Sequence, residues 1–262
     1  MRTAKDIDIP ATPAWPPKSA PRLFVADPLA EGAEISIEGP QAHYLARVMR
    51  VASGDGVVLC DDLTGEWAAR VADAGKHAVV LTVESLLRPR EAVPDFTLCA
   101  ALLKKDRFDL VLEKACELGV ARIQPVITRR CVADKLNLDR ARSILIEAAE
   151  QCARTALPQV AEPVKLDALL TNWQDGRTLV FADENGGDPA AIAFAAKTGP
   201  AALLTGPEGG FDECERAAIR AHPHARAIGL GPRILRGETA AIAGIALWMA
   251  LSGDWQMGDF PT

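Results

Sequence analysis

Hydrophobic and polar positions first repeat with the short period of β-strands. Between Leu23 and about Leu87, brief apolar runs are separated by turns rich in glycine and aspartate, a spacing typical of a small barrel or sandwich. The predicted strands are Leu23–Val25, Ile35–Ile37, Val57–Cys60, Glu66–Val71 and Ala78–Glu84. One helix interrupts them near Pro40, because proline suits the first position of a helix.

The pattern changes after Arg88–Pro94, a charged segment flanked by prolines that is typical of an interdomain linker. Beyond it, predicted strands alternate with predicted helices. The strands are Phe96–Leu102, Ile123–Ile127, Leu179–Ala182, Ala202–Thr205 and Ala227–Gly229, and the helices include Asp106–Leu118, closed by Gly119, and Asp139–Arg154. This alternation indicates the α/β class, with a parallel sheet that helices cover on both faces.

The segment before the first strand has a different character. Residues 1–20 are rich in proline, alanine and charge, which predicts a flexible leader. Its prolines interrupt the apolar stretch that a signal peptide would need, and no later segment is apolar for long enough to span a bilayer. The six cysteines form no C-x-x-C pair, so we interpret them as reduced thiols. We therefore expect a cytoplasmic protein without membrane contact.

The net charge narrows the ways in which the chain could bind nucleic acid. A formal charge of −6 excludes a protein that coats nucleic acid through its net charge, so any contact with RNA must use a local basic patch. His43, Arg47 and Arg50 share one face of the predicted helix, at i, i+4 and i+7. Three apolar residues of this helix are predicted to point elsewhere: Leu45, Val48 and Met49. Together with Arg22 the patch could contact RNA phosphates, although a solvated helix face would show the same pattern.

A glycine-rich loop, Gly206-Pro-Glu-Gly-Gly-Phe211, follows the predicted strand Ala202–Thr205. Asp212 and Glu215 fit a capping box, so the loop is expected at the carboxyl edge of the sheet, where ligands bind. It is neither a Walker loop nor a dinucleotide fingerprint. Glu208 would repel a phosphate by about 1–4 kcal/mol at contact distance. The loop therefore favours a neutral or cationic ligand, such as a sulfonium cofactor, unless its glycines serve the turn alone.

A second glycine loop lies in Ile228-Gly-Leu-Gly-Pro-Arg-Ile-Leu-Arg-Gly-Glu-Thr-Ala240, after the next predicted strand. Two such loops can form one pocket. The helix after it, Thr239–Leu251, carries only small or apolar residues on nearly every face, so it must be buried almost all round. The core of this chain and a subunit interface would satisfy that requirement equally well.

These motifs resemble the RsmE-type ribosomal RNA uridine-N3 methyltransferases of the SPOUT superfamily. The resemblance extends from Pro21 onward, and its specific pieces occur in the family's order. They are Gly206–Gly210, Leu230–Arg236 and Glu238–Ala240, supported by Glu117-Leu-Gly119 and by Glu147–Gln151 ahead of Arg154. One departure is Gly237, where the family leads us to expect a threonine or another side chain.

The resemblance implies a fold that periodicity could not reveal. After the leader, residues 21–90 would form a PUA-like RNA-binding β-barrel. Residues 91–256 would form a parallel-sheet α/β domain tied in a deep trefoil knot, a rare exception to the rule that chains do not thread loops. The family is also homodimeric, with the final apolar helix near the interface.

The resemblance further implies S-adenosylmethionine as cofactor, bent in the knot and held by the two glycine loops and the strand before them. The cofactor shell would be Leu204, Gly206, Glu208, Gly209, Gly210, Leu230, Gly231, Ile234, Leu235 and Thr239. A valine at Gly209 is expected to obstruct this pocket. No metal is expected, because the four histidines lack the grouping of metal ligands.

The implied reaction is methylation of N3 of a uridine in small-subunit (16S) ribosomal RNA. Arg236 would stabilise the anion that develops on the uracil, or would instead donate hydrogen bonds that hold the knot. Glu208 or Glu238 would accept the N3 proton, with a structural role as the alternative for each. Two other functions stay open: methylation of tRNA or another RNA position, and a non-catalytic RNA-binding or ribosome-assembly protein.

Overall fold

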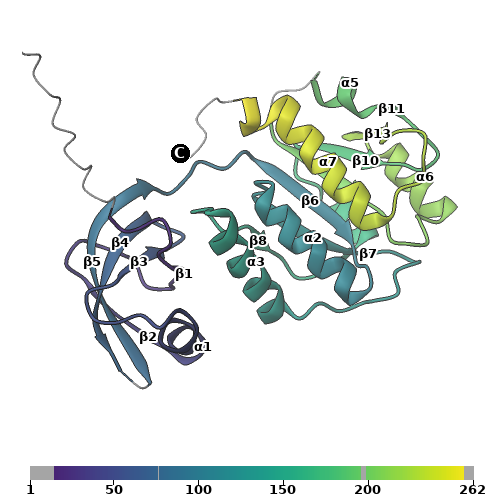
Figure 1. Cartoon of the computed structure of the whole chain (residues 1–262). Coiled ribbons are helices and arrows are strands. Elements are labelled where there is room, and N and C mark those ends of the chain that lie inside the picture. The colour runs from purple at the N-terminus through teal and green to yellow at the C-terminus, as the bar shows by residue number, and fades with distance from the viewer. Residues whose placement is uncertain (1–14, 76, 196–198, 257–262) are drawn as a thin grey trace, which may run out of the picture. The chain divides into compact units, whose positions relative to one another are not determined.

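The computed structural model describes residues 15–75, 77–195 and 199–256 (Figure 1). The chain divides into two compact units, Met1–Arg90 and Glu91–Thr262, and each is described here by itself. Of the predicted leader, residues 1–14 lie outside the described residues. Within the described part of the chain, no helix is both long and apolar enough to cross a membrane.

The first unit is a curled five-stranded sheet in the order β1-β3-β4-β5-β2. Its strands are β1 (Arg22–Phe24), β2 (Glu34–Glu38), β3 (Gly56–Cys60), β4 (Gly65–Ala74) and β5 (Ala78–Pro89). Only β1 and β3 pair in parallel, and register shifts between β4 and β5 bend this long hairpin around the core. All five predicted strands are confirmed. The predicted linker is wrong at its start, because Arg88 and Pro89 still pair with β4.

The predicted helix of this unit has two parts, α1 (Gly39–His43) and a π-helical segment, η1 (Tyr44–Met49). A π-helix has more residues per turn than an α-helix, so the spacing i, i+4, i+7 no longer defines a single face. Leu45 is fully buried, but Val48 and Met49 are 63% and 38% exposed. Of the three apolar residues, only Leu45 therefore joins the core, and the direction of Val48 and Met49 relative to the basic patch stays a prediction.

The second unit is a sheet in the order β11-β13-β10-β12-β6-β7-β8, with β9 beside β7, and every pairing in it is parallel. Its strands are β6 (Phe96–Ala101), β7 (Arg122–Ile127), β8 (Gln159–Val160), β9 (Val164–Lys165), β10 (Thr178–Ala182), β11 (Asp188–Pro189), β12 (Ala201–Thr205) and β13 (Ala225–Gly229). Its helices are α2 (Lys105–Glu117), α3 (Leu138–Cys152), α4 (Leu166–Thr171), α5 (Ala190–Ala195), α6 (Glu213–Ala221) and α7 (Gly237–Ser252), with a 3-10 turn η2 (Asp254–Gln256). The predicted parallel sheet is confirmed.

Helices cover both faces of this sheet, as predicted. On one face α7 packs against β6 and β12 and contacts α2 and α5, and α2 in turn contacts α3 (Figure 1). The Phe96 and Trp248 rings stack there with centroids 4.2 Å apart. On the other face, Leu166 of α4 and Ile219 of α6 join a buried cluster with Phe181 and Leu204.

The final helix is only half covered by its own chain. Ala241, Ile245, Trp248 and Met249 are buried, whereas four apolar neighbours on the helix stay partly exposed: Ile242, Ala243, Ala246 and Leu247. The helix also begins two residues earlier than predicted, at Gly237. The core of this chain therefore satisfies only part of the predicted burial. The trefoil knot stays a prediction.

Candidate active site

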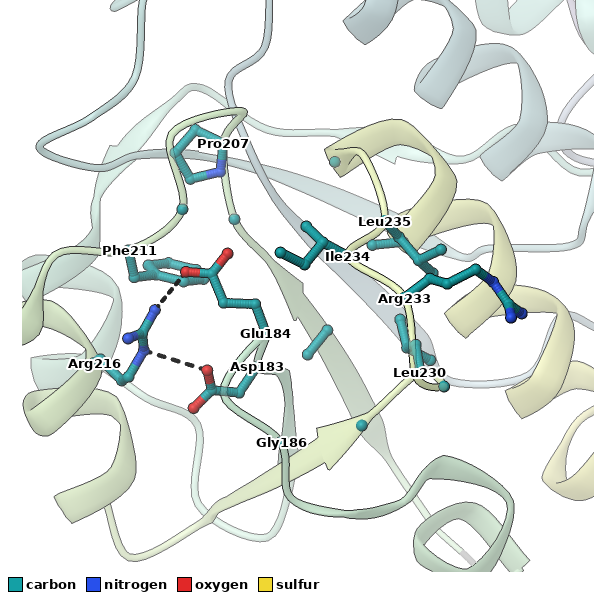
Figure 2. A pocket seen from close by; sticks show the side chains of 17 residues that line it. Asp183, Glu184, Gly186, Pro207, Phe211, Arg216, Leu230, Arg233, Ile234 and Leu235 are labelled. Atoms are coloured by element: carbon teal, nitrogen blue, oxygen red, sulfur yellow. Dashed lines mark hydrogen bonds and ion pairs between the residues drawn. The ribbon is translucent and has the colours of Figure 1, made fainter.

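Three loops meet at the carboxyl edge of the second sheet. They follow β10, β12 and β13 and enclose a hollow of about 670 Å³, counting the space open to solvent (Figure 2). Six residues of the predicted cofactor shell line it: Gly206, Gly210, Leu230, Gly231, Ile234 and Leu235. The two glycine loops thus share one pocket, as expected. They reach it from either side of β10, which lies between β12 and β13 in the sheet.

Neighbouring loops hold the first glycine loop in place. The backbone N–H of Lys104 donates to Oε1 of Glu208 at 3.1 Å. The Arg130 guanidinium donates to the Gly209 carbonyl at 2.9 Å. Because Lys104 follows β6 and Arg130 follows β7, three consecutive loops along the sheet edge are joined.

The predicted capping box is present at the end of the same loop. Asp212 Oδ1 accepts from the Glu215 N–H at 2.8 Å, and Glu215 Oε2 accepts from the Asp212 N–H at 3.1 Å. The hydrogen bond from Glu215 lowers the pKa of the Asp212 carboxyl, and the hydrogen bond from Arg129 lowers it further. The box therefore fixes the direction in which the loop enters α6.

Four residues of the predicted cofactor shell do not line the hollow: Leu204, Glu208, Gly209 and Thr239. The Leu204 side chain is fully buried in the core beneath α4 and α6. A Cβ at Gly209 would lie 3.3 Å from Cβ of Arg130, so it would point at that side chain. A valine at Gly209 is therefore no longer expected to obstruct the pocket. A side chain at Gly210 is, because Gly210 lines the pocket.

The second glycine loop presents an apolar side chain at the mouth of the hollow. Ile234 is 84% exposed, and Figure 2 shows it directed toward the loop that carries Pro207, whereas Arg233 extends away. Gly231 has a φ of 108°, a conformation that favours glycine. An exposed isoleucine on the wall of a pocket favours a flat apolar ligand that would cover it.

The structure shows why residue 237 is a glycine. A Cβ at this position would lie 2.9 Å from the carbonyl oxygen of Gly206 and 2.9 Å from a methyl group of Leu103. The glycine thus lets the first turn of α7 approach the end of β12 directly. A threonine here would require the backbone to shift, so the departure from the family pattern accompanies a local close approach.

The three predicted catalytic residues lie beside the hollow rather than in its wall. Arg236 is the N-cap residue of α7 and is exposed; in the described part of the chain, its guanidinium has no ion-pair partner. Glu238 is only 4% exposed and forms an ion pair with Arg107 of α2 at 3.0 Å. Glu208 keeps one carboxylate oxygen beyond its bond to Lys104.

A group of charged residues that sequence analysis missed forms another wall. Asp183 and Glu184 follow β10, and Arg216 of α6 lies between their carboxylates (Figure 2). The arginine is 3.2 Å from Asp183 and 2.8 Å from Glu184. Arg220 binds the other oxygen of Asp183 at 2.6 Å. The available signal was the stretch Ala182-Asp-Glu-Asn-Gly-Gly187 directly after a predicted strand.

The predicted RNA-binding residues lie in the first unit. His43, Arg47 and Arg50 are all exposed. Arg22 lies in β1 and forms an ion pair with Glu66 at 2.8 Å, so its charge is compensated. Burial raises the pKa of Glu66, but the bonds from Arg22 and Arg88 outweigh burial and bring the pKa below its usual value.

Metal ligands do not gather in the residues that the structure describes: no three His, Cys, Asp or Glu side chains there are placed to hold an ion.

Comparison with known families identifies both units. Residues 90–249 match the family model of the RNA methyltransferase domain. Residues 37–84 match that of the RNA methyltransferase PUA domain. The first match covers most of the second unit, including all three loops of the hollow.

Individual relatives cover nearly the whole chain. A protein of Synechocystis sp. named ribosomal RNA small subunit methyltransferase E is 32% identical over 88% of this chain and 77% of its own length. A protein of the same name from Rickettsia conorii is 29% identical over 86% of this chain and 93% of its own. The crystal structure of the protein of that name from Neisseria gonorrhoeae, bound to S-adenosyl methionine, superposes with a TM-score of 0.81. It is 29% identical and covers 90% of this chain and 99% of its own.

Proposed function

This chain belongs to the RNA methyltransferase family, and from that premise we propose that it methylates small-subunit ribosomal RNA with S-adenosylmethionine. The observation that carries the proposal is the convergence of three strand-end loops on one hollow. The relatives named for this activity match 86% and 88% of this chain. The finer proposal is that the methyl group goes to N3 of a uridine in 16S RNA.

The residues of the hollow fit this cofactor. Backbone groups of Gly206, Gly210 and Gly231 can approach a ligand closely, and Leu230 and Ile234 offer apolar contact to an adenine ring. At Gly210 the missing side chain also leaves room for Glu184 in the wall of the hollow, because a Cβ there would lie 2.7 Å from a carboxylate oxygen of Glu184. We propose that Leu204, Glu208 and Thr239 support these loops without touching the cofactor through their side chains.

When bound, the cofactor supplies a methyl group on a sulfonium, a strong electrophile. The protein must then align the uridine and help it lose its N3 proton. We propose that Arg236 lies against the uracil oxygens and stabilises the developing anion. Of the two predicted proton acceptors we favour Glu208, because Glu238 is buried and engaged by Arg107.

The first unit would hold the RNA. We propose that His43, Arg47 and Arg50 contact phosphates, which position the substrate without reading its sequence. Arg22 of β1 would add to the positive charge that attracts the phosphates, although Glu66 compensates its charge locally. Base extrusion would make the N3 atom accessible at a cost of a few kcal/mol. We place this activity in the cytoplasm, because ribosomal RNA is the substrate.

We further propose that a second copy of the chain covers the partly exposed apolar face of α7. Ile242, Ala243, Ala246 and Leu247 form that face. A cyclic dimer is the commonest way to bury such a surface. Sedimentation equilibrium should give twice the mass of the chain, and a monomer at micromolar concentration would remove this proposal.

Mass spectrometry of ribosomal RNA tests the activity itself. RNA digested from a strain that lacks this protein should lose one N3-methyluridine, and the gene supplied in trans should restore it. Loss of a methylated nucleoside from tRNA, or from another position, would transfer the activity to a different substrate. An unchanged set of modifications would favour the non-catalytic reading and contradict the proposal.

Glycine 210 offers a steric test of the hollow. Gly210→Ala should weaken S-adenosylhomocysteine binding at least about tenfold, or about 1.4 kcal/mol. Its φ of 67° disfavours a side chain, and the new Cβ would displace Glu184. Gly176→Ala is the matched control, because Gly176 has a φ of 84° but nothing within 4 Å of an added Cβ. Calorimetry that gives equal affinities for the two variants would count against a cofactor at Gly210.

A further inference from the structure

The carboxylate of Glu184 lines the hollow, but the proposed reaction gives it no role. It follows β10, lines the hollow and stays 41% exposed in its side chain. We propose that Glu184 accepts hydrogen bonds from the ribose hydroxyls of the cofactor. This inference rests on the proposed function and adds a recognition residue to it.

Buried neighbours hold the Glu184 carboxylate in a fixed orientation. Nη2 of Arg216 donates to its Oε1 at 2.8 Å. Arg216 is itself fixed, because its side chain is only 9% exposed and lies 3.2 Å from the fully buried carboxylate of Asp183. Glu184 therefore reaches the hollow already oriented, with Oε2 free of this bond. A ligand would meet a preorganised acceptor.

The charges of Glu184 and Arg216 favour an uncharged hydrogen-bond donor as the ligand group at this wall of the hollow. An ionised carboxylate can only accept hydrogen bonds, and Arg216 already compensates the charge of Glu184. The α-ammonium group of the cofactor would gain little there, since the guanidinium of the same ion pair would repel it. A hydroxyl is uncharged and meets no such repulsion. This cofactor carries two kinds of neutral donor, the paired hydroxyls of the ribose and the amino group of the adenine, and a 2′-deoxy analogue differs only in the first.

Asp183 cannot serve instead. Its Oδ1 accepts from the Asn185 N–H at 3.0 Å, and its Oδ2 accepts from Nε and Nη2 of Arg220 at 2.9 Å and 2.6 Å. Its side chain is also wholly inaccessible. Asp183 is thus a positioning residue for Arg216, whereas Glu184 faces the ligand space.

Location supports the same ligand group. Glu184 stands at the carboxyl end of the strand between the two glycine loops. In dinucleotide-binding proteins an acidic residue at this edge of a parallel sheet binds ribose hydroxyls, while a neighbouring glycine loop approaches the rest of the ligand. The close approach of Gly210 to Glu184 brings the same two features together here.

Calorimetry with three ligands tests the assignment. The ligands are S-adenosylhomocysteine, its 2′-deoxyadenosyl analogue, and 5′-methylthioadenosine, which keeps the ribose but lacks the ammonium group. Glu184→Gln should weaken S-adenosylhomocysteine and 5′-methylthioadenosine by a similar factor of about ten, since a charge-assisted hydrogen bond becomes a neutral one. The loss should shrink for the deoxy analogue, because the substitution and the missing hydroxyl remove the same bond.

Glu213→Gln is the matched control. Glu213 also pairs with Arg216, at 3.4 Å, but its side chain is 87% exposed and lies outside the wall of the hollow. This variant should bind all three ligands as the parent does. An equal loss in both variants would mean that the effect passes through Arg216 and would overturn a direct contact.

The remaining outcomes distinguish a failure of the ribose assignment from a failure of the proposed function. If Glu184→Gln weakens S-adenosylhomocysteine but not 5′-methylthioadenosine, Glu184 binds the ammonium group and the ribose assignment is wrong. If the variant binds all ligands like the parent, Glu184 has no recognition role. If the parent itself binds none of them, the proposed function fails before the inference is reached.

Discussion

Arg236→Ala is expected to bind S-adenosylhomocysteine like the parent and to transfer methyl groups to RNA about 10²–10³-fold more slowly. Removing one preorganised donor that faces a developing negative charge has an effect of this size. The Arg236 guanidinium is exposed at the N-cap of α7, directly after the loop that lines the hollow, and in the described residues it has no ion-pair partner. It is therefore free to meet a uracil.

Single-turnover methylation of small-subunit RNA measures this rate, with cofactor binding measured separately by calorimetry. Arg142→Ala is the control, because it removes another exposed arginine from α3. Arg236→Lys should recover part of the rate, since it restores the charge without the planar fork. Equal rates for Arg236→Ala and the parent would remove this arginine from the mechanism. A loss of cofactor affinity would assign it to the cofactor pocket instead.

Asp183→Asn is expected to lower the free energy of unfolding by about 3 kcal/mol. The Asp183 side chain is inaccessible to solvent and compensates two arginines, Arg216 and Arg220. The substitution leaves Arg216 with only the partly exposed Glu184 and the exposed Glu213 as ion-pair partners. Removing one partner from a buried ion pair lowers stability by about 3–5 kcal/mol, because the remaining charge is less well compensated. Arg216 is also 9% exposed in its side chain, so water cannot replace the lost partner.

Urea denaturation followed by tryptophan fluorescence measures this change. Asp188→Asn is the matched control, because Asp188 is 62% exposed and lies 3.9 Å from Arg226. Exposed pairs of this kind contribute about 0–1 kcal/mol. If both variants unfold at the same urea concentration, the Asp183 network does not stabilise the second unit in the way its burial indicates.

The long periodic segments of this fold could be predicted from sequence, whereas its short ones could not. Strands such as β6 and β12, and helices such as α2 and α3, are long enough for their hydrophobic period to repeat. By contrast β8, β9 and β11 have two residues each, and α4 and α5 have six. No period can be read over so few positions, so the region between α3 and β12 was predicted only at β10.

The order of strands in the sheet could not be predicted from the sequence pattern either. Both glycine loops were recognised from their motifs, and their convergence follows from the parallel sheet. That β10 lies between β12 and β13 depends on how the chain crosses the sheet, which local spacing does not encode. For this reason the sequence pattern did not single out Asp183 and Glu184, although they form a wall of the same hollow.

Backbone detail accounts for the other differences. The π-helical turn at Tyr44–Met49 changes which side chains share a face, and Arg50 ends it in a left-handed conformation with a φ of 56°. Residue spacing assumes a regular α-helix and so did not reveal that Val48 and Met49 stay exposed. Gly237 likewise has its reason in a contact with Gly206 and Leu103, which are distant in sequence.

Titration of the purified protein with S-adenosylhomocysteine in a calorimeter tests most directly whether the three strand-end loops form a cofactor site. We expect saturable binding of one molecule per chain, weakened at least about tenfold by Gly210→Ala and unchanged by Gly176→Ala. Saturation that is indifferent to Gly210→Ala would place the ligand elsewhere, and a parent protein that takes up no S-adenosylhomocysteine would contradict the account as a whole.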